Sequence, residues 1–458
     1  MGGERVLGLI DLGSRKVGCL IVAVGPAPLA SSADRAFNTY AGGGGADRTT
    51  VRVLGQGYTG SAGIKAGVIM DMGAAEGAVR TCVAQAEAAA GLTIRDVHVA
   101  VSCGRLASQS FAAHADVGTA GVLGSDISRA LSGGHAYARR HGRVVMHMNT
   151  IGYRIDGEPC GVDPRGLAAD RLTADLHAVT ADEGPIQNVL GLMQRCHLAV
   201  EKVVAAPFAS GLAASRGDER RLGVTVIDLG AGVTTLSIFA DRQLIHVDAI
   251  AVGGDRLTYD IAKAFQTPLA QAERIKALYG TVLEAQSDSR EIFAFETVGD
   301  RGGHLPAEAV ARGAGEGASQ NGLPAMGLRE RASKAELRLV ITPYVRWLLG
   351  QVRDRLSTCP VAALGGDHVV LTGGMAQLVG LEGLAADVLN RPVRIGMPGA
   401  VDGIRSEFCS PASSCLLGLA ESQRQGALQA YGFVGEADGA AGAAGYFERV
   451  GKWLVGTG

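Results

Sequence analysis

The sequence lacks the features that would place it in several broad classes of protein. Its formal net charge is −2, so it has no global basic field that would draw it to nucleic acid. No apolar stretch approaches the ~18 residues that cross a bilayer, and no basic region followed by an uninterrupted apolar run stands at the N-terminus. We therefore expect a cytosolic protein without a nucleic-acid partner, unless a local segment attaches it to a surface.

Grouped cysteines are also missing. The eight cysteines are scattered, with no C-x-x-C pair and no ligand-like grouping with histidine. This pattern argues against a zinc site or a disulfide framework and favours isolated thiols in a reducing cytoplasm. At 458 residues, of which 47% are apolar, the chain is long enough for two to four domains with ample core.

What the sequence does contain is a repeated motif. Residues 6–24 and 223–240 each contain an apolar β-branched run, Asp-Leu-Gly, a small turn rich in glycine and hydroxyl residues, and a second apolar run. Each copy is typical of a β-hairpin. Because the copies lie about half a chain apart, the sequence predicts two similar halves.

The tips of these hairpins suit a bound phosphate. Glycine lets backbone N–H groups approach an anion closely, and the hydroxyls of Ser14 and Thr234 can donate hydrogen bonds. Asp11 and Asp228 stand at the strand ends, where a carboxylate can hold Mg²⁺ through water. The pair of hairpins predicts a nucleotide held between duplicated domains.

Two further motifs fit the same site. In LTGGMAQLVGL (371–381), glycines follow an apolar strand and open onto a predicted helix, so backbone can lie flat against a planar or sugar group. Glu273 and Lys276 form an i,i+3 pair on one helical face. Such a pair alone would be an ordinary solvated ion pair, but together with two phosphate hairpins we assign it to the nucleotide site.

The remaining segments predict the organisation of the chain. Residues 26–50 have the composition of a flexible insertion, and an Ala-rich helix is expected over 73–90. From Val97 the pattern becomes strand-rich, which indicates an inserted module. A helix is expected over 333–356, in which Pro343 produces a kink or a restart.

The four motifs in this order resemble the actin-like ATPase superfamily, and the segments between them narrow the resemblance to the FtsA family of bacterial cell-division proteins. It covers almost the whole chain. The segments that match are SAGIKAGVIMDM, YRIDGE, VDPRGLAADRLTADLHAVTA, APFASGLAA, VGGDRLTYDIA, AERIKALYG and VVLTGGMAQLVGL. The inserted module is diagnostic, because actin, the filament-forming shape proteins and the heat-shock chaperone ATPases carry different insertions.

The resemblance implies an α/β protein with an actin-like (ribonuclease H-like) duplicated two-lobe fold and a small inserted α+β subdomain in the first half. The implied divisions are a first core subdomain over 1–95, the inserted subdomain over 96–180, a return to the first core over 181–216, a second core over 217–280, a small subdomain over 281–365, the rest of the second core over 366–420, a linker over 421–444 and a C-terminal amphipathic helix over 445–458.

The resemblance also implies ATP and Mg²⁺ between the lobes. The implied site comprises Asp11, Gly13, Ser14 and Lys16 in the first phosphate loop, Asp228, Gly230, Gly232 and Thr234 in the second, Glu273 and Lys276 on the ribose or adenine, Gly373 and Gly374 beneath the base, and Asp11 and Asp228 for the metal. Arg15 departs from a small hydroxyl residue in the family, and Val233 departs from Thr. No residue stands out as the one that activates water, so the sequence predicts nucleotide binding rather than rapid hydrolysis.

The last residues form a distinct segment after a Gly- and Ala-rich stretch. On a helical wheel the apolar residues fall within about 120°, opposite the charged ones, which is the pattern of an interfacial helix. The apolar residues are Tyr446, Phe447, Val450, Trp453 and Leu454, and the charged ones are Glu448, Arg449 and Lys452. A helix that docks on its own domain is the alternative. In the resembling family this segment is the membrane anchor, and we expect Phe447, Val450, Trp453 and Leu454 to contact lipid.

The resemblance implies partners at the cytoplasmic face of the inner membrane, at the division septum. They are the C-terminal peptide of FtsZ at 281–365, further copies of the chain in filaments, and later division proteins at the inserted subdomain. Tyr344 and Trp347 stand where the family often has Arg and Glu, and this aromatic pair forms either an apolar groove or core. Two alternatives remain: a pilus-assembly adaptor of the same superfamily, which needs no amphipathic tail, and a small-molecule kinase of the same fold.

Overall fold

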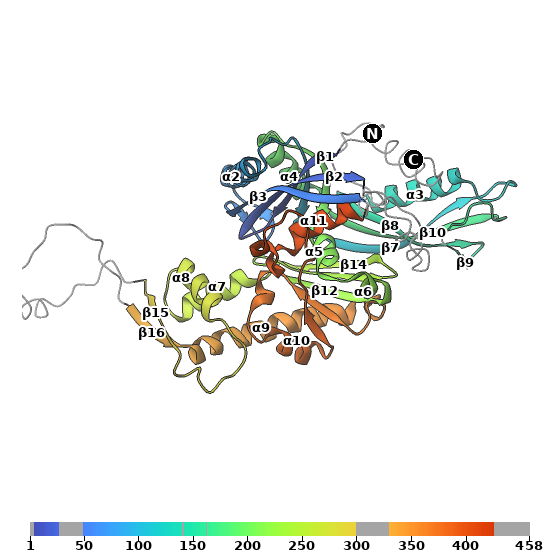
Figure 1. Ribbon diagram of the computed structural model, residues 1–458. Coiled ribbons are helices and arrows are strands. Elements are labelled where there is room, and N and C mark those ends of the chain that lie inside the picture. The colour runs from blue at the N-terminus through green and yellow to red at the C-terminus, as the bar shows by residue number, and fades with distance from the viewer. Residues whose placement is uncertain (1–3, 27–48, 140–141, 162, 299–328, 426–458) are drawn as a thin grey trace, which may run out of the picture.

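The computed structural model describes residues 4–26, 49–139, 142–161, 163–298 and 329–425 (Figure 1). Most of the predicted 26–50 insertion lies outside these residues, as do nearly all of the predicted linker and the whole of the predicted C-terminal helix at 445–458.

Two five-stranded sheets form the two lobes, and they share one topology. The first sheet has the spatial order β11 (Ala199–Ala205), β6 (Asp96–Val101), β1 (Arg5–Leu12), β2 (Lys16–Pro26) and β3 (Thr49–Gly60). The second has the order β18 (Val393–Ile395), β17 (Val369–Thr372), β12 (Val224–Leu229), β13 (Thr234–Ala240) and β14 (Gln243–Ile250). In each sheet the first three strands run parallel and the last two continue antiparallel. The duplication predicted from the two Asp-Leu-Gly motifs is therefore confirmed.

Helices cover these sheets and also lie between them. The strands β1, β2, β12 and β13 are almost continuously buried, as expected for strands with packed elements on both faces. The helix α2 (Met72–Ala90) packs on β2 and β3, and α4 (Glu183–Arg195) packs near β11. Two helices lie at the centre of the molecule, α5 (Ala206–Ala214) and α11 (Ser414–Arg424) (Figure 1).

The helices α5 and α11 pack unusually closely, and they connect the lobes. A Cβ placed on Gly418 of α11 would lie 1.8 Å from the carbonyl oxygen of Ala209 on α5, so the backbones touch with no side chain between them. The helix α11 packs against β1, β2 and β3, whereas α5 packs against β12 and β13 of the other lobe. This glycine contact sets how far apart the two sheets lie.

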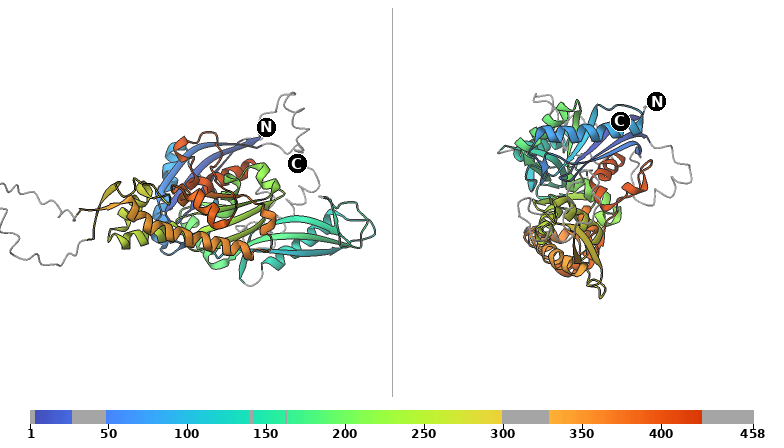
Figure 2. Two further views of the ribbon diagram at one scale, coloured as in Figure 1. Left: turned by 90° about the horizontal axis from the view of Figure 1, so that it is seen from below. Right: turned by 90° about the vertical axis from the view of Figure 1, so that its left-hand side faces the viewer.

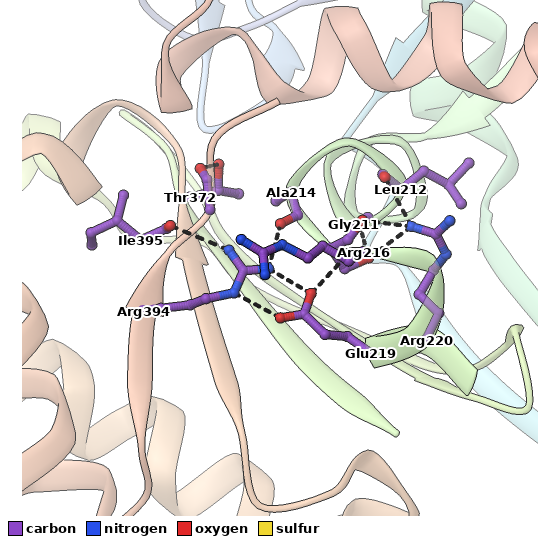
Figure 3. A network of polar contacts seen from close by, with 11 residues as sticks. Gly211, Leu212, Ala214, Arg216, Glu219, Arg220, Thr372, Arg394 and Ile395 are labelled. Atoms are coloured by element: carbon purple, nitrogen blue, oxygen red, sulfur yellow. Dashed lines mark hydrogen bonds and ion pairs between the residues drawn. The ribbon is translucent and has the colours of Figure 1, made fainter. Parts of the chain in front are cut away.

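A polar network fixes the other end of α5. Arg394 on β18 donates two hydrogen bonds to the carboxylate of Glu219 on α6 (Gly217–Leu222), at 2.8 and 2.5 Å (Figure 3). Buried Arg220 donates to the carbonyl of Leu212 at 3.1 Å, and Arg394 donates to that of Ala214 at 3.0 Å. These bonds satisfy carbonyls at the C-terminal end of α5, which have no partner within the helix.

The inserted subdomain projects from one end of the molecule (Figures 1 and 2). It consists of α3 (Gly124–Ala138) on a sheet with the order β7 (Ala107–Asp116), β10 (Arg171–Asp182), β8 (Arg143–Ile155) and β9 (Glu158–Cys160). The predicted start at residue 96 is wrong, because β6 pairs with β1 in the first core sheet. The apolar run of β6 could form a strand of the core sheet or of the inserted sheet. Only the strand pairing shows that it belongs to the core sheet.

Hydrogen bonds attach the inserted subdomain to the second lobe. The hydroxyl of Ser108 accepts from the backbone N–H of Val247 on β14 at 2.6 Å, and Asn149 donates to the carbonyl of Leu244 at 3.1 Å. His177 lies between Ser108 and Asn149, at 2.9 and 3.2 Å, and is fully buried. Burial lowers the pKa of His177 to about 3, so this ring is neutral near pH 7.

A small subdomain occupies the opposite end (Figure 2). It contains α7 (Gly254–Ala264), α8 (Leu269–Tyr279), β15 (Ile292–Glu296), β16 (Arg329–Ser333) and the long helix α9 (Lys334–Thr358). The predicted boundary at 280 is wrong, because Tyr279 of α8 stacks on Phe293 of β15 with ring centroids 4.9 Å apart. The helix α9 does not restart at Pro343, which lies inside one continuous helix.

Shorter elements complete the fold. They are β4 (Ile64–Lys65), β5 (Val68–Ile69), α10 (Leu381–Leu389) and the 3₁₀ turns η1 (Ala362–Gly365), η2 (Gly374–Gln377), η3 (Ser406–Phe408) and η4 (Pro411–Ser413).

Candidate functional site

A cavity of about 490 Å³ lies between the two lobes, within the usual size range of small-ligand pockets. Both Asp-Leu-Gly hairpins line it, together with α8 and the glycines after β17. Of the predicted nucleotide-site residues, the structure brings to this cavity Asp11, Gly13, Ser14, Lys16, Asp228, Gly230, Gly232, Glu273, Lys276, Gly373 and Gly374. Thr234 is the one that does not line it.

The two hairpins have the same geometry. In the first, the N–H of Gly13 donates to the carbonyl of Lys16 at 3.1 Å, and in the second the N–H of Gly230 donates to that of Val233 at the same distance. Asp11 is paired across the hairpin with Gly18, and Asp228 occupies the equivalent position. The two carboxylates therefore enter one cavity from opposite lobes.

The prediction that Thr234 faces the ligand is wrong, because its side chain points away from the cavity. Successive strand residues point to opposite faces, and Thr235, not Thr234, is paired with Asp228 and shares its face. Thr234 is fully buried and donates to the carbonyl of Val252 at 2.9 Å. The hydroxyl of Thr235 lines the cavity and is buried without a hydrogen-bond partner among the described residues. Alternation counted from Asp228 could have identified it.

The tips of the hairpins meet across the cavity. A Cβ on Gly232 would lie 2.4 Å from the Ser14 hydroxyl oxygen and 2.9 Å from the Cα of Ala66, so only glycine fits there. The Ser14 oxygen accepts a hydrogen bond from the N–H of Gly67 at 2.9 Å. That bond leaves the hydroxyl proton of Ser14 available for an anion.

One cation lies beside the two carboxylates. The Nζ of Lys16 donates to the carbonyl of Ala412 at 2.9 Å and lies 5.0 Å from the ring centre of Tyr58. Burial lowers the pKa of Lys16, and the charge of Asp11 works against that shift. Burial raises the pKa of Asp11 and raises that of Asp228 to about 6. The cavity floor thus holds buried oxygen ligands of the kind that Mg²⁺ prefers, next to a lysine.

Gly373 lies directly against this floor. Its φ is +89°, and a Cβ would lie 2.3 Å from the Oδ1 of Asp228, so both conformation and space require glycine. Gly374 has room for a side chain, with its nearest neighbour 3.9 Å away. The helix predicted directly after these glycines begins only at Leu381, because η2 and the left-handed Gly380 come first.

Glu273 and Lys276 belong to a hydrogen-bonded group on one wall. The Lys276 ammonium lies 2.7 Å from the Glu273 carboxylate and donates to the hydroxyl of Thr258 at 2.8 Å. Burial alone would raise the pKa of Glu273, but Lys276, Thr258 and Arg15 together hold it below its ordinary value. The pair is therefore an ordered part of the cavity wall, with Lys276 the more buried of the two.

Several lining residues were not predicted from the sequence. Ser102 follows β6, Ala206 begins α5, and Cys415 lies in the first turn of α11. The N-termini of α5 and α11 therefore reach the cavity, as does that of α7 at Gly254, and such ends favour anions. Their position depends on strand order and helix packing, which the sequence does not reveal.

The two aromatic residues on α9, Tyr344 and Trp347, differ in burial. Tyr344 is buried, and its hydroxyl donates to the carbonyl of Gly253 at 2.6 Å. Trp347 is 48% exposed. Tyr344 is thus core, while Trp347 lies at the surface. Among the described helices, none combines the length and the apolar composition that a membrane crossing needs.

Comparisons with known proteins agree on one family. The family model described as "Cell division protein FtsA" matches residues 225–418, and the model "SHS2 domain inserted in FTSA" matches residues 103–180. The protein named "Cell division protein FtsA" from Rhizobium meliloti (strain 1021) is 33% identical over 455 residues, which cover 98% of this chain and 94% of that protein. The protein of the same name from Escherichia coli (strain K12) is 28% identical over 411 residues, which cover 88% and 91%.

Solved structures agree on the fold. The chain is similar to a structure of the PilM–PilN type IV pilus biogenesis complex, with a TM-score of 0.57 at 15% identity, over 91% of this chain and 98% of that one. It is also similar to MreB5 of Spiroplasma citri bound to ADP, with a TM-score of 0.50 at 13% identity, over 92% and 97%. At these identities the likeness extends to the fold alone, which is the predicted actin-like one.

The pilus-assembly alternative therefore has only a shared fold in its favour, whereas the sequence matches extend over nearly the full length of cell-division proteins and include the inserted subdomain. The chain belongs to the FtsA family of cell division proteins.

Proposed function

We propose that this protein binds ATP with Mg²⁺ in the cavity between its lobes and acts as a polymerising adaptor that tethers FtsZ filaments to the membrane. The observation that carries the nucleotide proposal is the duplicated pair of hairpins. Their carboxylates, Asp11 and Asp228, enter one cavity from opposite lobes beside Lys16.

The residues present fit such a ligand. Gly232 lets the second hairpin approach Ser14 of the first, and Gly373 lets the backbone lie against Asp228, because a Cβ at either position would collide with those residues. The unpartnered hydroxyl of Thr235 and the N-termini of α5 and α11 supply donors for phosphate oxygens. Asp11 and Asp228 would hold the metal, and Lys16 would neutralise phosphate charge. Glu273 and Lys276 would contact the ribose or base from their wall.

Bound Mg²⁺ and ATP would supply the link that closes the two lobes. We assign no residue to the activation of water, and we expect hydrolysis to be slow at most. The solved structure of MreB5, which shares the fold, contains ADP, and this supports a purine nucleotide as the ligand.

The adaptor role rests on family membership and on the C-terminal sequence. The amphipathic segment at 445–458 lies outside the described residues, and its apolar stripe would bind the cytoplasmic face of the inner membrane at the septum. One copy would bind weakly, whereas side-by-side copies in a filament gain avidity of ~10²-fold or more. FtsZ would bind at 281–365, and later division proteins at the inserted subdomain.

Nucleotide binding is tested by isothermal titration of the full chain with ATP, with and without Mg²⁺. We expect Mg²⁺-dependent binding that Asp11→Asn and Asp228→Asn each weaken by at least ~10-fold, since each removes an ionised ligand. The matched control is Asp241→Asn in the exposed turn between β13 and β14. Absence of binding to the unmodified chain would refute the nucleotide proposal.

Membrane attachment is tested separately by liposome flotation. We expect the full chain to float with vesicles that contain anionic lipid, and a chain that ends at residue 440 to remain at the bottom. Equal flotation of both chains would eliminate the tether.

A further inference from the structure

Arg15 occupies a position in the first hairpin that has no side-chain counterpart in the second. Because the two turns have the same geometry, Arg15 in the first hairpin is equivalent to Gly232 in the second. Gly232 packs directly against Ser14. The second hairpin therefore forms the same turn with glycine at this position. The arginine side chain is an addition whose role the phosphate-binding hairpin itself does not explain.

The guanidinium of Arg15 crosses from the first lobe to the second. Its Nη2 lies 2.9 Å from the Oδ1 of Asp255 and 3.1 Å from the Oε2 of Glu273. Asp255 stands in the first turn of α7, and Glu273 stands on α8, so one side chain contacts two helices of the opposite lobe.

The partners of Arg15 are themselves fixed. The backbone N–H of Asp255 donates to the carbonyl of Ala231 in the second hairpin at 2.8 Å, and Glu273 is held by Thr258 and Lys276. Arg15 therefore links the tip of the first hairpin to residues that are fixed on the second lobe. Both Arg15 and Glu273 line the cavity.

Solvent exposure indicates where this contact lies. The side chains of Arg15, Asp255 and Glu273 are 47%, 41% and 34% exposed, whereas that of Lys276 is 14% exposed. The Arg15 contacts thus lie at the solvent side of the cavity and the Lys276 contacts lie deeper. A ligand that spans from Lys16 to Lys276 would lie beneath the Arg15 side chain.

We propose that Arg15, held by Asp255 and Glu273, forms a strap between the lobes that closes the mouth of the cavity and slows the exit of the bound nucleotide. The inference rests on the proposed nucleotide function and deepens it by naming a residue that controls exchange. Arg15 is a positioning residue here, because it acts through the relative position of the lobes.

The test measures release of a fluorescent nucleotide, mant-ATP, from the full chain by stopped-flow displacement with excess ATP. We expect Arg15→Ala and Asp255→Asn each to raise the dissociation rate by about 2–10-fold, as suits partly exposed ion pairs. The double variant should be no faster than Arg15→Ala alone, because Arg15→Ala already removes both contacts of the strap. Salt near 0.5 M should bring the unmodified chain close to the variants.

The matched control is Arg256→Ala. Arg256 is 62% exposed and adjacent to Asp255, but it pairs with Asp260 on its own helix and not across the cavity. Its dissociation rate should equal that of the unmodified chain. A faster release in Arg15→Ala together with unchanged release in Asp255→Asn would show that Asp255 does not hold the strap, and would overturn the proposal.

A second measurement works without nucleotide. Hydrogen exchange of the ligand-free chain, followed by mass spectrometry at residues 230–233, should be faster in Arg15→Ala and Asp255→Asn than in Arg256→Ala, because Ser14 covers this loop only while the lobes are closed. Identical exchange in all three variants would refute the strap. If mant-ATP fails to bind the unmodified chain, the proposed function is wrong, and the exchange result still decides whether the strap exists.

Discussion

The contact between Gly418 and Ala209 gives a direct prediction about how the two lobes are held. In Gly418→Ala the new Cβ would lie 1.8 Å from the Ala209 carbonyl oxygen, where real Cβ contacts do not fall below 3.0 Å. The helices α5 and α11 must therefore separate by about 1.2 Å. Overpacking of this kind in a well-packed core costs typically ~1–3 kcal/mol.

The opposing gain is smaller. Replacing a helical glycine with alanine favours the helix by about 0.5–1 kcal/mol when there is space for the methyl group. The net effect of Gly418→Ala should be destabilisation by ~1–2 kcal/mol. For a cooperative unit of 150–250 residues this lowers Tm by about 2–8 °C. The same displacement moves Ala206 and Cys415, which line the cavity, so affinity for Mg²⁺ and ATP should also fall.

The assay is thermal unfolding of the full chain by circular dichroism, with Gly77→Ala as the matched control. Gly77 lies in the middle of α2, is exposed, and has no atom within 4 Å of an added Cβ, so this variant should be slightly more stable than the unmodified chain. If Gly418→Ala unfolds at the same temperature as Gly77→Ala, the helices tolerate the methyl group and the argument from close packing is wrong.

Three further predictions follow from other contacts. Gly373→Ala should reduce ATP affinity by at least ~10-fold in calorimetry, because its φ is positive and its Cβ would collide with Asp228. Gly383→Ala on α10, outside the cavity and with no atom within 4 Å of the added Cβ, should leave affinity unchanged. Burial lowers the pKa of His147 and of His177 to about 3, so the unfolded chain binds more protons below pH 6.5, and the free energy of unfolding should fall by up to ~1.4 kcal/mol per pH unit for each ring. His177→Gln should reduce the dependence of stability on pH, measured by thermal unfolding between pH 7.5 and 5. An unchanged dependence would contradict the assignment of a lowered pKa to His177. Tyr344→Phe should lower stability by ~1–2 kcal/mol in urea unfolding, since the buried carbonyl of Gly253 loses its donor, whereas Trp347→Phe at the surface should change it little.

The duplicated hairpins and nearly all of their cavity-lining residues can be predicted from the sequence alone. The reason is that each hairpin is local: an apolar run, Asp-Leu-Gly and a tight turn fix their own backbone within about twenty residues, so composition and spacing predict them. The sequence also indicates that two lobes of the same kind exist, because the motif occurs twice.

Which residues of distant segments meet depends on the packing of the complete fold. Packing of α5 against α11 brought Ala206 and Cys415 to the same cavity, and the approach of the lobes placed Arg15 against Asp255 and Glu273. These contacts join residues hundreds of positions apart, and their formation depends on burial and strand order in the whole fold, which no local pattern encodes.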